Sequence, residues 1–230
     1  MSHTYSVVGR CERTGMLGVA LATSSIAVAA RCAFAEANVG AVASQNVTDP
    51  RLGTLGLALL RQGYGARAVV EELVRAGRYP DYRQLACVDR DGGSATWTGA
   101  RAFPTAAELA EPNLAVAGNL LAGVRVVDAM AAAFRASAGL HLADRLVRAL
   151  AAGRAAGGER DGGEHSAGLR VVDREPFPLV DLRVDWVEAD PVGRLAELWD
   201  RYRPEMELYR LRALDPPAAE RAATPNEVSR

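Results

Sequence analysis

The chain contains no lysine: all 27 of its basic residues are arginine. It therefore has no lysine for a Walker phosphate loop, none for a Schiff base with pyridoxal phosphate and none for a Ser–Lys catalytic dyad. The 28 acidic residues bring the formal net charge to -1, whereas nucleic-acid-binding domains carry a strongly basic surface. The composition excludes these enzyme classes and predicts no nucleic-acid partner.

Histidine and cysteine are also scarce, with three of each. Neither C-x-x-C nor H-E-x-x-H occurs, which excludes zinc ribbons, thioredoxin-like sites and zincins, so we expect no metal and no cofactor. The odd number of cysteines and the lack of an apolar signal segment predict a reducing, cytoplasmic location. No uncharged apolar run reaches the roughly 18 residues of a membrane span, so we expect no membrane partner.

What the chain does have is length and apolar content, with 230 residues of which 49% are hydrophobic. A chain of this size buries roughly 70% of its unfolded surface and needs no metal or disulfide to fold. We expect a single domain over residues 1–210. Pro216 and Pro217 begin a stretch of tail-like composition, so we expect residues 211–230 to be a disordered tail.

Short apolar runs and turn residues predict a chain of paired strands and paired helices. The segment 5–9 and the near-continuous apolar run 16–22 form a predicted hairpin, with Gly15 in the turn. Asp91-Gly92 marks a second hairpin. Further strands are predicted at 39–45, 85–89, 95–98, 114–119, 168–173 and 179–185, and helices at 52–61, 66–76, 124–135, 141–154 and 192–209.

The order of these elements argues against a nucleotide-binding Rossmann fold, which alternates single strands with helices and offers G-x-G-x-x-G. Strands that come in antiparallel pairs, separated by paired helices, fit two stacked antiparallel sheets with helices on the outer faces. We therefore predict an α/β protein of the α+β kind, built as a four-layer α/β/β/α sandwich.

Six segments, taken in order, resemble the bacterial family called domain of unknown function 1028. They are TYSVV (4–8), TGMLGVA (14–20), VGAVASQ (39–45), AGNLL (117–121), AAGG (155–158) and VDLRVD (180–185). That family is grouped with the N-terminal-nucleophile hydrolases, which have the same sandwich fold. The resemblance implies that a Thr, Ser or Cys at the mature N-terminus attacks an amide, with its own α-amine as the base.

The beginning of the chain departs from the pattern of that family, whose members often begin Met-Thr-aromatic-Ser. Here Met1, Ser2 and His3 precede Thr4, which matches the leading threonine of the family. Three interpretations stay open. Ser2 is the nucleophile after removal of Met1, Thr4 is the nucleophile after trimming or a later start, or the chain has no N-terminal nucleophile.

Three polar residues follow the predicted strand 39–45 or end it. Gln45, Asn46 and Asp49 lie where a buried strand runs into a loop, a common position for substrate-binding groups. Asp49 precedes Pro50, and this pair is also a good helix cap. We expect Gln45 and Asn46 to bind substrate, and for Asp49 both the binding and the capping interpretation remain.

Other candidates lie near the ends of other predicted strands. Asn119 is placed to donate to a developing oxyanion or, alternatively, to form a turn. Asp181 shares a strand face with Arg183, where it either orients the N-terminal amine or forms a partly solvated ion pair. Thr23 ends the second strand and either lines the site or belongs to a turn.

The predicted function is hydrolysis of a small amide, such as a peptide fragment, an N-acyl or an N-carbamoyl compound. The alternative is a non-catalytic small-molecule-binding or scaffold protein on the same fold. The aromatic and methionine residues of the last helix form a stripe, and the resemblance implies oligomers, so we expect a homodimer that uses this helix. The stripe consists of Trp199, Tyr202, Met206 and Tyr209.

Overall fold

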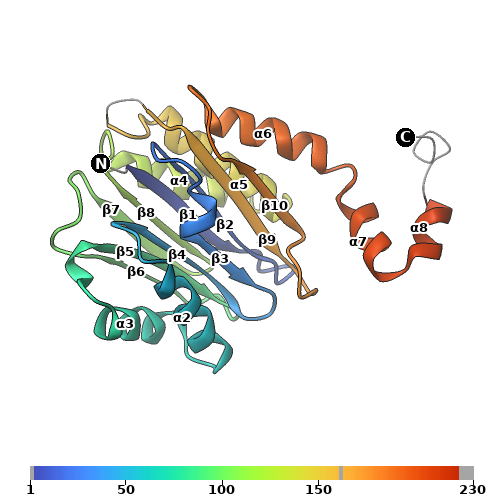
Figure 1. Cartoon of the computed structure of the whole chain (residues 1–230), viewed down its shortest axis with the longest axis horizontal. Coiled ribbons are helices and arrows are strands. Elements are labelled where there is room, and N and C mark those ends of the chain that lie inside the picture. The colour runs from blue at the N-terminus through green and yellow to red at the C-terminus, as the bar shows by residue number, and fades with distance from the viewer. Residues whose placement is uncertain (1–2, 161–162, 223–230) are drawn as a thin grey trace.

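A computed structural model describes residues 3–160 and 163–222. This part of the chain forms two antiparallel β-sheets and eight α-helices (Figure 1). The predicted α+β class with two antiparallel sheets is therefore confirmed.

The larger sheet has six strands in the order β10-β9-β2-β1-β8-β7, and every neighbouring pair is antiparallel. The predicted first hairpin forms β1 and β2, so β1 lies in the interior of this sheet. The strands are β1 (Thr4–Arg10), β2 (Leu17–Thr23), β7 (Ala107–Glu111), β8 (Leu114–Asn119), β9 (Ser166–Val172) and β10 (Val180–Val184).

The smaller sheet has four strands in the order β3-β4-β5-β6. They are β3 (Ala33–Glu36), β4 (Gly40–Asn46), β5 (Arg83–Asp89) and β6 (Ser94–Thr98). The predicted turn at Asp91-Gly92 joins β5 to β6, and Gly92 adopts the positive φ that this turn requires. The sequence did not predict β3 or β7, because both are short and lack a run of β-branched residues.

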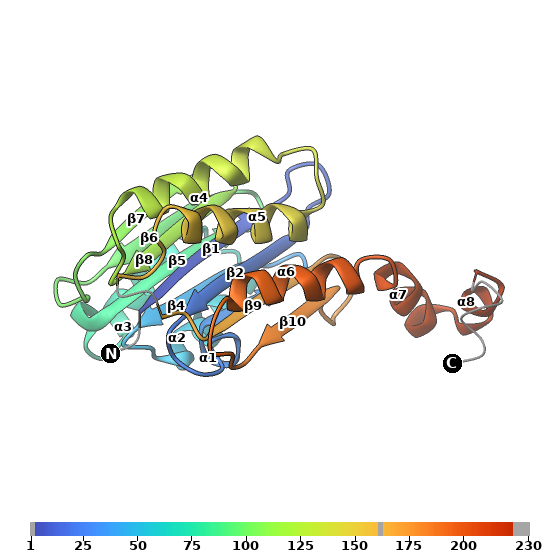
Figure 2. The same ribbon diagram turned by 90° about the horizontal axis from the view of Figure 1, so that it is seen from above.

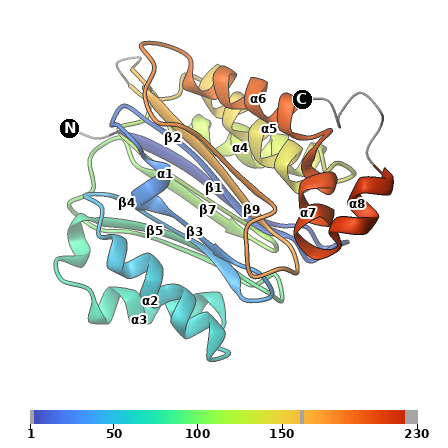
Figure 3. The same cartoon turned by 45° about the vertical axis from the view of Figure 1, so that its right-hand side comes forward.

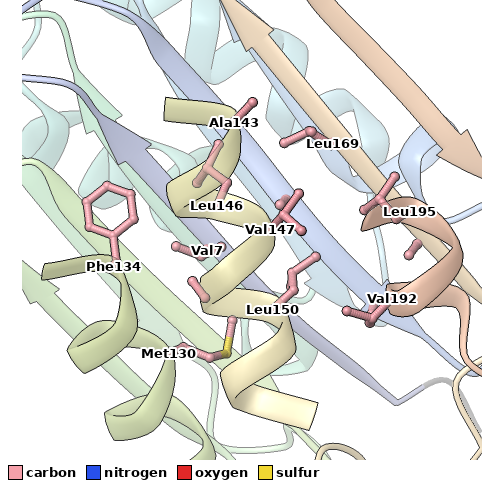
Figure 4. Close-up of a cluster of buried hydrophobic side chains, with 14 of the residues drawn as sticks. Val7, Met130, Phe134, Ala143, Leu146, Val147, Leu150, Leu169, Val192 and Leu195 are labelled. Carbon is pink, nitrogen blue, oxygen red and sulfur yellow. The ribbon is translucent and has the colours of Figure 1, made fainter. Parts of the chain in front are cut away.

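Helices cover one face of each sheet, and the other faces of the sheets pack on each other (Figures 1 and 2). On the larger sheet lie α4 (Arg125–Ala136), α5 (Leu142–Ala155) and α6 (Pro191–Tyr202); on the smaller sheet lie α2 (Pro50–Arg61) and α3 (Ala66–Ala76). Figure 4 shows part of the apolar core between α4, α5, α6 and the larger sheet. A second core of small apolar residues fills the space between the two sheets.

Two short helical segments connect these layers. The first, α1 (Ala29–Cys32), lies between β2 and β3, and the 3-10 segment η1 (Pro80–Tyr82) leads into β5. Alternation along the strands separates the two cores. On β1, Tyr5 and Val7 face the helices, whereas Val8 faces the smaller sheet.

The C-terminal region differs from the sequence prediction in two ways. The predicted helix 192–209 is interrupted after Tyr202, where Pro204 cannot donate a backbone hydrogen bond, and the chain resumes as α7 (Met206–Leu214). The region expected to be disordered is helical through α8 (Pro216–Ala222), whose first turn is capped by Asp215 accepting from the Ala218 N–H at 3.1 Å. Residues 223–230 of the expected tail lie outside the described residues.

Helices α7 and α8 extend from the end of α6, away from the two sheets (Figure 3). No residue of α7 is buried, and Ala219 is the buried residue of α8. By contrast, Trp199 of α6 is 2% exposed and stacks on His141. The stripe predicted for an interface is thus divided, because its first residue belongs to the core of its own chain.

The helices of the described ranges include none with both the length and the hydropathy of a membrane span.

Candidate active site between the two sheets

A row of buried polar side chains crosses four strands of the larger sheet. In the antiparallel register, Thr4 of β1 lies opposite Thr23 of β2 and Asn119 of β8, and Thr23 lies opposite Ser166 of β9. Paired residues share a sheet face, and Tyr5 faces the helices, so this row faces the smaller sheet. All four residues are at most 2% exposed.

The smaller sheet carries a matching row. Gln45 of β4 lies opposite Gln84 of β5, and Gln84 lies opposite Thr98 of β6. The Gln84 Oε1 accepts from Gln45 Nε2 at 2.8 Å and from Asn119 Nδ2 at 3.0 Å. Its Nε2 donates to Thr98 Oγ1 and to the Gly118 carbonyl, both at 2.9 Å. Gln84 therefore connects the two sheets.

We call these two rows the polar cluster; it consists of Thr4, Thr23, Asn119, Ser166, Gln45, Gln84 and Thr98. Two of its acceptors, Gln45 Oε1 and Asn119 Oδ1, are buried without a hydrogen-bond partner among the described residues. The neighbouring Ser6 Oγ is in the same condition. An unmet buried polar group costs about 1–3 kcal/mol, so the cluster has capacity to bind a polar ligand with N–H groups.

Thr4 is the first residue of β1 and is 2% exposed. Its Oγ1 lies 3.1 Å from Thr23 Oγ1. The preceding residue, His3, is held at the end of β2, where its N–H donates to Ser24 Oγ at 3.1 Å and its carbonyl accepts from Thr23 Oγ1. In this form of the chain the hydroxyl is in place, but the Thr4 nitrogen is part of a peptide bond. Ser2 lies outside the described residues.

Glu159 is a buried carboxyl beside this N-terminal arm, and sequence reasoning missed it. Its Oε1 accepts from the Ser24 N–H at 3.0 Å, and its Oε2 lies 3.4 Å from His3 Nδ1. Burial, followed by the nearby Glu164 carboxylate, raises the pKa of Glu159 to about 8. At neutral pH the group is thus mostly protonated in this form of the chain.

Glu159 belongs to the Gly-rich loop between α5 and β9. Such a composition is typical of an exposed loop, yet Glu159 is 2% exposed and forms a β-bridge with Leu121. Glu164 of the same loop accepts from the Tyr5 hydroxyl at 3.1 Å. The signal that the sequence offered was the run of acidic residues before Ser166, which are Glu159, Asp161 and Glu164.

Two predicted substrate-binding residues, Asn46 and Asp49, bond to other parts of the chain and not to the two rows. Asn46 ends β4 with a positive φ, and its side chain donates to the Tyr82 carbonyl at 2.6 Å and accepts from the Phe103 N–H at 3.1 Å. Asp49 caps α2 by accepting from the Arg51 N–H at 3.2 Å. Asn46 therefore holds a loop, and the capping interpretation of Asp49 is the one observed.

Asp181 is not brought to Thr4. It lies on β10, three strands from β1. Asp181 pairs with Arg170 of β9, and Arg170 pairs with Val19 of β2, which is four residues from Thr23. Asp181 forms ion pairs with Arg170 at 2.7 Å and Arg183 at 2.9 Å. Although burial raises it, hydrogen bonds from these two arginines hold the pKa of Asp181 below its ordinary value. The ion-pair interpretation is the one observed.

Gln84 and Ser166 were not among the predicted site residues. The predicted strand began at Leu85, but extending its alternation backward by one residue places Gln84 on the face of Ala86 and Val88, which line the space between the sheets. Ser166 follows His165 in the sequence, but adjacent residues of an extended chain point to opposite faces, so this pair predicts no dyad. Ser166 belongs to the row because β9 pairs with β2 and places it opposite Thr23. The sequence does not show this pairing.

No metal-binding arrangement competes with the polar cluster as a site in the described ranges. Within them, no group of three or more His, Cys, Asp or Glu side chains lies together as metal ligands would. The chemistry available in the cluster is that of hydroxyls and carboxamides.

Comparison with known proteins adds a family. A crystal structure of protein SPO2555 from Silicibacter pomeroyi, of the DUF1028 family, is similar with a TM-score of 0.81 and 31% identity over 87% of this chain and 86% of that one. Anbu (ancestral beta-subunit) from Yersinia bercovieri gives a TM-score of 0.40 and 12% identity over 88% and 96%, too low to support a conclusion. No curated protein matches. The model of the family of unknown function DUF1028 matches residues 4–195, and the chain belongs to that family.

Proposed function

We propose that the chain is an amide hydrolase of the N-terminal-nucleophile type, with Thr4 as the nucleophile and the four-layer α/β/β/α arrangement of that superfamily. The observation that carries the proposal is the position of Thr4. Its hydroxyl lies buried between the sheets, 3.1 Å from Thr23 Oγ1 and in register with Asn119. The family match also begins at Thr4.

The reaction requires Thr4 to be the first residue. Its α-amine, with an ordinary pKa of about 7.7–8.0, then accepts the hydroxyl proton. The Oγ1 attacks the amide carbonyl, the C–N bond breaks, and the proton passes from the α-ammonium to the leaving amine. Water, deprotonated by the same amine, hydrolyses the resulting acyl ester. An acid and an amine are released, and Thr4 is regenerated.

Two carboxamides of the polar cluster are suited to hold the substrate. Asn119 lies beside Thr4, where an amide N–H stabilises the developing oxyanion. The Gln45 Oε1, which has no hydrogen-bond partner in the part of the chain that the structure describes, accepts from a substrate N–H. The seven residues of the polar cluster include no ionisable side chain, so the cluster favours a small, neutral, polar amide over a charged one.

Glu159 supports the amine in this scheme. Its carboxyl lies against His3, the residue whose removal exposes the Thr4 amine. A buried carboxyl near a new α-ammonium loses its proton more readily and stabilises that positive charge. We assign Glu159 the role of positioning the amine rather than contacting the substrate.

The alternative function is binding without catalysis. It is favoured by one observation: Thr4 is 2% exposed and preceded by His3, which two hydrogen bonds hold at the end of β2. If that arrangement persists in the mature protein, no N-terminal amine is available at Thr4. The orphaned acceptors of the cluster then serve a bound ligand only.

Three forms of the chain test the proposal, beginning at Met1, at Ser2 and at Thr4, each released from a cleavable fusion. They are assayed against a panel of dipeptides, N-acyl and N-carbamoyl amino acids. The form that begins at Thr4 is expected to exceed the Met1 form by about 100-fold or more in kcat/KM, since a positioned base contributes that much. A matched form beginning with Ala in place of Thr4 controls for contaminating hydrolases.

Each outcome selects one interpretation. Equal activity of the forms beginning at Met1 and Thr4 contradicts an N-terminal nucleophile. Highest activity of the form beginning at Ser2 assigns the nucleophile to Ser2. Saturable ligand binding with no hydrolysis by any form supports the non-catalytic alternative.

A further inference from the structure

A second polar cavity lies at the other end of β1. It is lined by the turn between β1 and β2, the turn between β7 and β8, the end of α4 and the start of α5. Its volume is about 590 Å³. Small-molecule sites have volumes of about 300–1,000 Å³. Six residues of extended strand separate Arg10 from Thr4, or about 20 Å. The cavity is therefore separate from the polar cluster.

Four guanidinium groups line this cavity, and three of them have no carboxylate partner. Arg135 pairs with Glu111 at 2.8 Å. No ion pair within 4.0 Å involves Arg10, Arg13 or Arg145 among the described residues. The remaining carboxylate of the lining, Glu12, is exposed. The cavity thus has a net positive charge that no anion of the described chain offsets.

Arg145 is 7% exposed, and within the described residues its guanidinium bonds to a backbone carbonyl and to the Cys11 thiol. Its Nε and Nη2 both donate to the Phe134 carbonyl at 3.3 Å, and its guanidinium carbon lies 3.8 Å from the centre of the Phe134 ring. Burying a charged group without an opposite charge is costly. A bound anion would offset that cost.

Arg10 contributes donors to the same space. Its Nη1 donates to Asn113 Oδ1 at 3.0 Å, whereas its Nε is buried without a hydrogen-bond partner within residues 3–160 and 163–222. Arg13 reaches across the cavity to the Gly139 carbonyl at 3.2 Å with Nη2. Both side chains belong to the β1–β2 hairpin, so they approach Arg145 of α5 from a different wall.

We propose that this cavity binds a small oxyanionic ligand, through a phosphate or carboxylate group held by Arg10, Arg13 and Arg145. Guanidinium groups bind both kinds of oxyanion through paired, charge-assisted hydrogen bonds. The convergence of three guanidiniums without carboxylate partners, one of them buried, on one cavity of ligand size carries the assignment.

Cys11 lines the same cavity and responds to the same arginines. Although burial raises it, hydrogen bonds from Thr14 and Arg13 and the charge of Arg145 hold the pKa of the Cys11 thiol below its ordinary value. The surroundings of this sulfur therefore already favour a negative charge. Cys87, buried within the smaller sheet, lies in an apolar environment instead.

The first test is isothermal titration of the full chain with sodium phosphate and, separately, sodium succinate, at ionic strength held constant with sodium chloride. Saturable binding with one site per chain is expected for at least one of the two. The double variant Arg10→Gln, Arg13→Gln is expected to bind at least about tenfold more weakly. Arg194→Gln, an exposed arginine of α6 outside the cavity, is the matched control and should bind like the unaltered chain.

The second test locates the ligand without relying on variants of Arg145, which also holds the end of α4. Iodoacetamide modification of each cysteine is followed by mass spectrometry with and without the anion. Slower modification of Cys11 in the presence of the anion supports the proposal, and slowing by phosphate or by succinate alone tells which oxyanion the cavity prefers. Absence of saturable binding by both anions, or equal binding by the double variant, overturns it.

Discussion

The Oγ1 atoms of Thr4 and Thr23 lie 3.1 Å apart on neighbouring strands, between the two sheets. The Thr23 hydroxyl donates its single proton to the carbonyl of His3, so in this contact the Thr4 hydroxyl is the donor. One side chain thus binds both the candidate nucleophile and the residue that precedes it. Removing His3 frees Thr23 to donate to Thr4, which would make the Thr4 oxygen easier to deprotonate.

Substitutions of the two predicted catalytic residues Asn119 and Asp181 should differ strongly in their effect on kcat. In the form that begins at Thr4, Asn119→Ala is expected to lower kcat by about 100-fold or more, the usual effect of losing an oxyanion donor. Asp181→Asn is expected to change kcat less than about twofold, because Asp181 is bound to Arg170 and Arg183 on a distant strand. Steady-state kinetics on the best amide substrate measures both, and a loss in Asp181→Asn as large as that in Asn119→Ala would contradict the site.

Gln84 should be a determinant of stability as well as of the site. Gln84→Leu removes the acceptor shared by Gln45 and Asn119 and leaves both buried amides without their partner. At about 1–3 kcal/mol for each unmet group, the free energy of unfolding should fall by about 3 kcal/mol in urea titrations. Gln62→Leu, an exposed glutamine at the end of α2, is the matched control and should change it by less than about 0.5 kcal/mol.

The raised pKa of Glu159 predicts that the free energy of unfolding depends on pH. Its pKa of about 8 in the folded chain exceeds the unfolded value of about 4.3, so between these values the folded state retains a proton that the unfolded state releases. The stabilising contribution is complete below pH 4.3, declines as the pH rises, and is lost above about 8. In the Met1 form, the difference in unfolding free energy between the unaltered chain and Glu159→Gln should therefore decrease from pH 5 to 8.

The slope of that difference is at most about 1.4 kcal/mol per pH unit. Glu197→Gln, which removes an exposed carboxylate on α6, should show no such slope. A difference that stays flat from pH 5 to 8 would mean that Glu159 is ionised in the folded chain.

We propose a homodimer whose interface excludes Trp199 and uses the exposed end of the predicted stripe. Trp199 donates to Asp144 Oδ1 at 2.9 Å and is buried in its own chain, so Trp199→Ala should destabilise the fold by about 3–5 kcal/mol. The exposed side chains of Tyr209 and Leu214 on α7 remain available for an interface. Sedimentation equilibrium should give twice the chain mass of 24.4 kDa, and Leu214→Asp should weaken the association. A monomer at micromolar concentration would contradict this proposal.

Local patterns predicted much of the fold, because strand and helix periodicities depend on neighbours in sequence. The hairpin of β1 and β2 and the turn at Gly92 followed from apolar alternation and turn chemistry. The break at Pro204 was overlooked because the apolar spacing of the last helix continues past it. The C-terminal helices also form where composition alone suggested disorder.

The site was predictable only in part, because it is assembled by register between distant strands. Thr23, Gln45 and Asn119 were identified from their positions at strand ends and Thr4 from the family resemblance, and the structure brings all four into the polar cluster. The local sequence does not tell which of Gln45 and Asn46 points into the space between the sheets, because this depends on how β4 is oriented in the sheet. Glu159 was hidden in a Gly-rich loop, because its burial depends on the bridge to Leu121.

The most direct test of the central claim is to trap the nucleophile. The form that begins at Thr4 is incubated with an amine-releasing acyl compound or a β-lactone, and tandem mass spectrometry locates the acyl group. The account predicts one acyl ester on Thr4 Oγ1, absent from the form beginning with Ala at that position and from the chain that begins at Met1. An adduct on another residue, or no adduct under conditions in which amide hydrolysis is measurable, would contradict it.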